Sequence, residues 1–108
     1  VAPQIAATVA GLQVLTDAMG RRTHGLAMLP LYLMELAKGT MAKEGAPEVV
    51  RDRGVCSLWD GRYLPGLWLV NEAVQQSMAR AREHGVAVVA MRCNAAPTSA
   101  LPYLSPAA

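Results

Sequence analysis

Apolar residues recur at spacings of three and four along the first part of the chain, which is the period of one helix face. This face consists of Ile5, Val9, Leu12, Leu15 and Met19. Gly20 follows directly and is a reasonable stop for the helix. The pattern therefore predicts a first helix over residues 5–19 that buries this face.

A second helical stretch is expected from Thr23, acting as the N-terminal cap, to Lys38, with Gly39 just beyond its end. Pro30 removes a backbone donor inside this stretch and clashes with the preceding turn. We therefore expect a kink or a break near Leu29, and two helices that meet at residues 20–25.

The pattern changes after residue 46. The runs 48–51 and 55–59 are separated by Gly54 and followed by Asp60-Gly61, which predicts two short strands joined by a turn. Pro65 then stands where a helix can begin, and Gly85 closes that helix. Its apolar face consists of Leu67, Val70, Val74, Met78 and Ala81. Residues 86–91 form a continuous apolar run, which is typical of a strand buried on both faces.

These elements predict an α+β fold with an N-terminal helical pair, a short two-stranded hairpin, a long helix and a buried strand. The 108 residues are enough for one modest domain. Within it we distinguish a helical segment (1–45), a β-β-α-β segment (46–92) and an irregular tail (93–108), which holds three of the seven prolines.

The composition also predicts that part of the surface is a buried interface. Apolar residues make up 53% of the chain and charged residues 17%, against typical values of about 45–50% and about 25%. A surface this short of charge indicates a buried interface. The net charge of +2 comes from scattered basic residues, which excludes a nucleic-acid footprint.

The sequence has no membrane-spanning pattern. The longest apolar run, residues 26–34, is interrupted by Pro30 and is shorter than the roughly 18 residues that a span needs. The first twenty residues lack the basic start of a signal peptide, so we expect a cytoplasmic protein. Cys56 and Cys93 lack metal-ligand spacing and are expected to be free buried thiols, and no metal site is predicted.

The candidate chemistry lies at Thr23-His24-Gly25, where an imidazole, a hydroxyl and a glycine meet at a turn. His24 could donate a proton near neutral pH, and Gly25 would let a ligand approach the backbone. The structural alternative is a capping turn with an incidental histidine. Arg21 and Arg22 could bind a phosphate or carboxylate, or could form a solvated turn or a partner contact.

Two other features favour structural roles. His84 ends the long helix, where a cation suits the helix dipole. Gly61 and Gly66 are too far apart for a dinucleotide-binding glycine motif, and no G-K-[ST] sequence occurs.

The stretch around the histidine carries a family resemblance. Residues 16–32 read TDAMGRRTHGLAMLPLY, which is similar to the pattern A-D-x-R-G-x-x-S-H-G-L-x-R-L-x-x-Y. That pattern is typical of the malate/L-lactate dehydrogenase family of the second type, which includes ureidoglycolate, sulfolactate and diketogulonate oxidoreductases and piperideine-carboxylate reductases. The register continues through Gly39, Ala46-Pro47, Asp60-Gly61, Gly66, Ala81, Gly85 and 89–92. Nearly the whole chain resembles the N-terminal part of this fold.

The resemblance implies roles for residues of the turn, and at some positions this sequence differs from the family pattern. It makes His24 the proton donor to a substrate carbonyl or imine and Thr23 the residue that orients it. Arg21, Arg22 and Gly25, chosen for their chemistry, are the candidate substrate-binding residues. Met28 stands where the family has a carboxylate-binding arginine, and Ala96 stands where it has a second histidine. The second histidine belongs to a family pattern like V-R-x-S-x-H-F-G, in which Asn94 occupies the serine position, and beyond this pattern only Tyr103 matches the family.

Two functions are consistent with the resemblance. The chain is either one subunit of a split oxidoreductase, with NADH or NADPH bound mainly by a partner chain, or a catalytically silent subunit that stabilises or regulates a partner. A homo-oligomer is also open. The expected ligand is a small-molecule substrate, and neither nucleic acid nor membrane is an expected partner.

Overall fold

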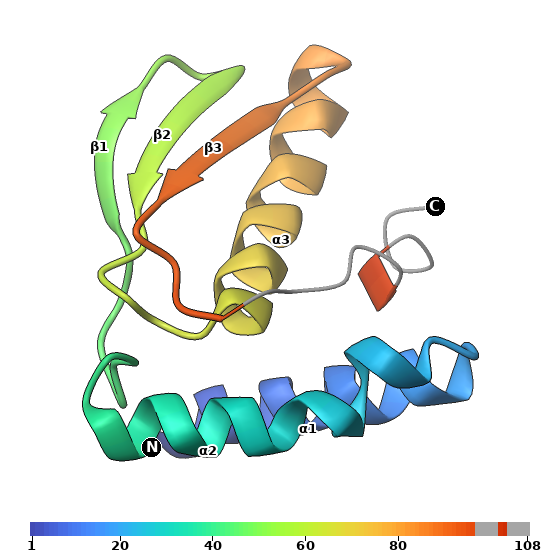
Figure 1. The fold of residues 1–108 in the computed structure, drawn as a ribbon. Helices are drawn as coiled ribbons and strands as arrows, with labels where there is room; N and C mark the ends of the chain where they lie inside the picture. The colour runs from blue at the N-terminus through green and yellow to red at the C-terminus, as the bar shows by residue number, and fades with distance from the viewer. Residues whose placement is uncertain (97–101, 104–108) are drawn as a thin grey trace.

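The computed structural model describes residues 1–96 and 102–103 of the chain. Its helical layer consists of α1 (Pro3–Ala18) and α2 (Leu29–Lys38), which lie beneath the rest of the molecule (Figure 1). Each helix has a proline in its first turn, where a missing N–H costs no hydrogen bond. Gly39 ends α2 in the left-handed conformation, as the sequence predicts.

The break predicted near Leu29 is confirmed, because α2 begins there. The stretch from Thr23 to that point is not regular α-helix. It forms two short 3₁₀ turns, η1 (Arg22–His24) and η2 (Leu26–Met28). The 3₁₀ turns let the chain reverse within a few residues between the two helices.

A three-stranded sheet with α3 (Gly66–His84) on one face forms the second layer (Figure 1). The strand order is β1 (Glu48–Asp52), β2 (Cys56–Asp60), β3 (Val88–Arg92), with β1 antiparallel and β3 parallel to β2. The pairing of β1 with β2 shifts between Val49 and Arg51, so Val50 is an extra residue in the edge strand. The parallel pair is connected through α3, the usual route for such a connection.

The prediction that 86–91 forms a strand is confirmed, but the prediction that it is buried on both faces is wrong. Val88 is 53% exposed, and β3 alternates between exposed and half-buried residues. The physical reason is its position at the edge of a sheet that α3 covers on one face. Cys56 was expected to be buried and is free but exposed. It begins the central strand β2, in which Ser57 and Trp59, on the other side of the pleat, are buried.

The core lies where the helical layer meets the first turn of α3. Ile5 of α1, Tyr32 of α2 and Leu67 of α3 are each at most 3% exposed and pack in one cluster that also contains Tyr103. Backbone bonds tie the layers together: the Ala42 amide donates to the Tyr63 carbonyl oxygen at 2.8 Å. Most of the predicted irregular tail, 97–101 and 104–108, lies outside the described residues.

The buried stripe of α1 differs from the predicted one. Leu15 and Met19 are 39% and 38% exposed, and Gln13 and Thr16 are buried in their place. The cause is the reversal after Gly20, which packs the following turn against the side of α1 that carries Gln13. No helix among the described residues is long and apolar enough to cross a membrane.

Candidate functional site

The turn that joins α1 to α2 carries the predicted proton donor. The Thr23 Oγ1 and His24 Nδ1 atoms are 2.9 Å apart, and both residues are exposed. When the imidazole is protonated, Nδ1–H donates to the Thr23 oxygen and Nε2–H remains for another acceptor. The prediction that Thr23 caps a helix is wrong, because its hydroxyl bonds to the histidine ring and makes no capping bond.

Gly25 anchors this turn on α1. It is buried, and a Cβ placed on it would lie 1.9 Å from Asp17 Oδ1 and 2.8 Å from the carbonyl oxygen of Gln13. No side chain fits in that space without displacing the helix or the turn. The glycine thus fixes the place of His24 relative to α1, and the side of Gly25 expected to admit a ligand instead contacts α1.

Arg21 and Arg22 directly precede Thr23 and His24 and are exposed. Neither forms an ion pair within the described part of the chain. Exposed guanidinium groups can bind an anionic group of a substrate. His84 lies far along the chain at the end of α3, where its Nε2 is 3.7 Å from Glu83 Oε2.

The position expected for a second histidine lies beside the start of α3. Ala96 has a left-handed φ of 61°, and its carbonyl oxygen would be 2.7 Å from a Cβ on Gly66 at the start of α3. Asn94 Nδ2 also approaches Gly66 and would be 3.6 Å from the same Cβ. No described hydrogen bond or ion pair joins this segment to His24.

Met28, which replaces the family's arginine, is half-buried and packs against the core. Two tyrosines, Tyr32 and Tyr103, contact the first turn of α3 through the Leu67 backbone. Tyr103 Oη donates to the Leu67 carbonyl oxygen at 2.8 Å. Burial raises the pKa of the Tyr32 phenol, and a hydrogen bond with the Leu67 backbone opposes that rise. Both tyrosines are therefore structural parts of the core here.

The turn after β2 has glycines at 61 and 66, and the space beside each is filled by the protein itself. A Cβ on Gly61 would lie 2.6 Å from Leu69 Cδ1, and one on Gly66 would meet the Ala96 carbonyl. These two glycines therefore serve internal packing. The described residues also contain no group of three or more potential metal ligands.

Sequence reasoning missed two polar groups beneath the turn. Gln13 is 1% exposed, and its Nε2 has no hydrogen-bond partner among the described residues. Asp17 Oδ1 is also buried and unpartnered there. They are one helical turn apart in α1, on the side that meets Gly25. The apolar period of α1 contained no signal for them, since polar residues at those positions indicate a solvated face.

Comparison with known proteins identifies the fold and the family. The sequence model of the malate/L-lactate dehydrogenase family matches residues 1–108. This chain belongs to that family. The resemblance seen in residues 16–32 and in the register beyond them is thereby confirmed.

Three relatives show the extent of the match. The 2,3-diketo-L-gulonate reductase of Klebsiella pneumoniae is 26% identical over 92 residues, covering 85% of this chain and 28% of the relative. The L-lactate dehydrogenase of Cupriavidus necator is 32% identical over 88 residues, covering 82% and 25%. The structure of sulfolactate dehydrogenase from Methanocaldococcus jannaschii superposes with a TM-score of 0.89 at 24% identity, covering 95% of this chain and 30% of that one.

The likeness to sulfolactate dehydrogenase confirms the α+β fold predicted from the sequence. The chain spans between a quarter and 30% of the length of these relatives. The described residues thus correspond to the portion of a malate/L-lactate dehydrogenase that carries the His24 turn.

Proposed function

We propose that this chain supplies the proton donor of an NAD(P)H-dependent oxidoreductase that reduces the carbonyl or cyclic imine of a small acid. His24 donates the proton, Thr23 holds its ring, and Arg21 and Arg22 attract the anionic substrate. The observation that carries the proposal is the 2.9 Å pairing of Thr23 Oγ1 with His24 Nδ1 on a turn fixed by Gly25. The names of the relatives, which are dehydrogenases and reductases, support it.

The hydride donor belongs to another part of the enzyme in this proposal. NADH or NADPH would be bound mainly by a partner chain, or across a homo-oligomer, because Gly61 and Gly66 pack against the protein itself. The chain itself then binds substrate and delivers the proton.

The alternative is a catalytically silent subunit that stabilises or regulates its partner. Met28 and Ala96 favour it, since each replaces a polar group that the family resemblance implies. The half-buried position of Met28 against the core is what a purely structural residue would have.

Turnover of the assembled enzyme decides between the two. We expect His24→Ala to lower kcat by roughly 10²–10⁴-fold, the usual contribution of a positioned acid. His84→Ala is the matched control, because His84 is the other of the two histidines and lies at the end of α3. It should leave kcat unchanged, and both variants should assemble normally.

The orienting role of Thr23 gives a second measurement. Thr23→Ser keeps the hydroxyl and should retain activity, whereas Thr23→Val should lower kcat and shift its pH profile. Unchanged turnover in His24→Ala, with assembly intact, would refute the catalytic role and leave the silent subunit.

A further inference from the structure

A hollow of about 390 Å³ opens between the loop after α2 and the turn after β2. Its described lining residues come from these two segments and are Gly39, Thr40, Ala42, Arg62 and Tyr63. The hollow follows the C-terminal end of α2, whereas the His24 turn precedes the N-terminal end of that helix, which is about 15 Å long. It is therefore separate from the proposed proton donor, and its volume is in the range of small-molecule sites.

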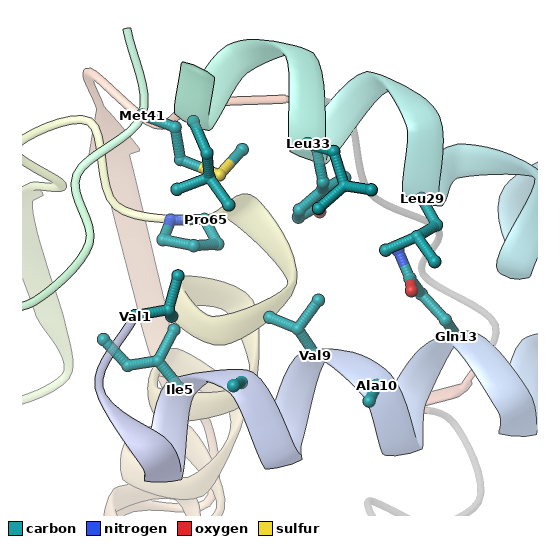
Figure 2. A pocket seen from close by; sticks show the side chains of 12 residues that line it. Val1, Ile5, Val9, Ala10, Gln13, Leu29, Leu33, Met41 and Pro65 are labelled. Carbon is teal, nitrogen blue, oxygen red and sulfur yellow. The ribbon is translucent and has the colours of Figure 1, made fainter. Parts of the chain in front are cut away.

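Both walls of the hollow are anchored in the core. Met41, between Thr40 and Ala42, is 2% exposed and points into the apolar groove between α1 and α2 (Figure 2). Leu64, directly after the turn, is 1% exposed. The Ala42 amide donates to the Tyr63 carbonyl oxygen at 2.8 Å, which connects the two walls. The hollow is thus formed before any ligand binds.

The turn holds Arg62 and Tyr63 in a conformation that disfavours them. The Leu64 amide donates to the Gly61 carbonyl oxygen at 2.9 Å, and the two residues between them have left-handed φ values of 50° and 59°. This is a type I′ turn, in which asparagine and glycine are the usual central residues. A Cβ in this conformation lies close to the following carbonyl oxygen. Arg62 and Tyr63 therefore make the turn less stable than asparagine and glycine would.

The fold makes little use of these two side chains. Tyr63 is 59% exposed, and the Arg62 side chain is 63% exposed. Within the described part of the chain, the Arg62 guanidinium makes one bond, from Nη2 to Glu48 Oε2 at 2.9 Å. Such an exposed ion pair contributes little to stability. Because strained residues cluster at ligand sites, an outward-facing pair kept in a strained turn indicates a bound ligand.

The lining favours a flat ligand that carries a negative charge. Of the described lining residues, Arg62 is charged, and its Nε and Nη1 groups have no acceptor within residues 1–96 and 102–103. A carboxylate accepts hydrogen bonds from such a group. The exposed Tyr63 ring provides a face against which a planar ring can stack. Together they fit an aromatic acid, in which a ring and a carboxylate are joined.

We propose that this hollow binds a small aromatic carboxylate, whose charged group bonds to Arg62 while its ring stacks on Tyr63. Glu48 competes with the ligand for the guanidinium, because its carboxylate already accepts from Nη2. Binding of a ligand as small as benzoate is therefore weak, with a Kd of roughly millimolar order. The site lies outside the proposed reaction, so its ligand is not the substrate that His24 protonates.

Three ligands of similar size test the two contacts on the full chain. Benzoate has both the charge and the aromatic ring, benzamide lacks the charge, and cyclohexanecarboxylate lacks the aromatic ring. We expect saturable amide NMR shifts at residues 39–42 and 61–64 with benzoate. The other two should bind at least about threefold more weakly, since each loses one of the two contacts.

Matched variants separate ligand binding from turn stability. Arg62→Asn and Tyr63→Gly supply residues that a type I′ turn prefers, and each should weaken benzoate binding at least about fivefold. Tyr63→Gly should also raise the Tm by about 2–5 °C, because it relieves the left-handed strain. Glu48→Gln removes the competing carboxylate and should tighten binding about twofold to fivefold. Arg53→Gln, at an exposed arginine between β1 and β2, should bind benzoate like the parent chain.

Other outcomes overturn the proposal. Equal affinity for the three ligands, or shifts confined to other segments, would mean that the hollow does not recognise an aromatic acid. Unchanged binding in Arg62→Asn or Tyr63→Gly would remove the contact in question. A lower Tm in Tyr63→Gly would show that the tyrosine serves the fold. None of these measurements uses turnover, so failure of the His24 role is detected separately.

Discussion

The two layers of the molecule differ in whether their charged surface residues form ion pairs. In the sheet layer, ion pairs connect neighbouring segments: Arg62 to Glu48 at 2.9 Å, Arg80 to Asp52, and Arg92 to Asp60 at 3.0 Å. In the helical layer, no charged side chain of α1, η1, η2 or α2 forms an ion pair with a described residue, and leucines and valines are exposed.

The difference lies in how each layer distributes its charged and apolar side chains. The sheet layer forms ion pairs among its own residues, while Val49, Val50 and Val88 are exposed on its strands. The helical layer uses its inner face for the core and leaves its outer side apolar, next to the turn that carries His24. Substitutions in the two layers should therefore have unequal effects in the chain alone.

The largest effect is expected where the layers meet. Leu69 of α3 is completely buried, and Leu69→Ala should lower the free energy of unfolding by about 2–5 kcal/mol through lost contacts and a cavity. Leu33→Ala, on the exposed side of α2, should change it by less than about 0.5 kcal/mol because Leu33 is 56% exposed. Urea titrations of both variants measure the contrast. Equal losses would mean that Leu33 is buried in the free chain in solution.

A smaller effect is expected at the turn beneath His24. Gly25→Ala places a Cβ against Asp17 and should cost about 1–3 kcal/mol, with displacement of the turn. Gly11→Ala in α1 is the matched control, since nothing lies within 4 Å of its added Cβ, and it should stabilise the helix by up to about 1 kcal/mol. Chemical shifts of the His24 ring should change in the first variant only. An unchanged ring environment in Gly25→Ala would contradict the anchoring role of this glycine.

The smallest effect concerns acidification of the sheet layer. Hydrogen bonds from Arg80 and from the Gly54 amide lower the pKa of Asp52 from 3.8 to about 2. Because the folded pKa is the lower one, the stabilisation is complete above the unfolded value and is lost as the pH falls from about 4 toward 2. Urea midpoints between pH 7 and pH 2 should fall less in Asp52→Asn than in the parent chain. Parallel curves would show that the Asp52–Arg80 pair contributes nothing measurable.

Much of the fold could be predicted because it is encoded locally. Pro30 placed the start of α2 near Leu29, and Gly39 and Gly85 marked the ends of two helices. The burial of β3 could not be predicted in this way. An apolar run shows that a strand forms, but whether that strand lies at an edge depends on how many strands the sheet contains.

The candidate site was predictable in part for a similar reason. The position of His24 at a turn could be inferred from the sequence, but the partner of the Thr23 hydroxyl could not. A threonine before a turn can cap the next helix or bond to the neighbouring ring, and the 3₁₀ geometry of η1 decides between them. The burial of Gln13 depends on the approach of Gly25 from outside α1, which no periodicity of α1 can show.

The bond from Tyr103 Oη to the Leu67 carbonyl oxygen bears on the order of events during synthesis. The β1–β2 pairing joins residues close together in the sequence and can form while later residues are still being translated. The cluster that contains Ile5, Leu67 and Tyr103 joins the first helix to a residue translated much later, so it can close only after Tyr103 has left the ribosome. Until that moment, the cluster that covers Ile5 is incomplete.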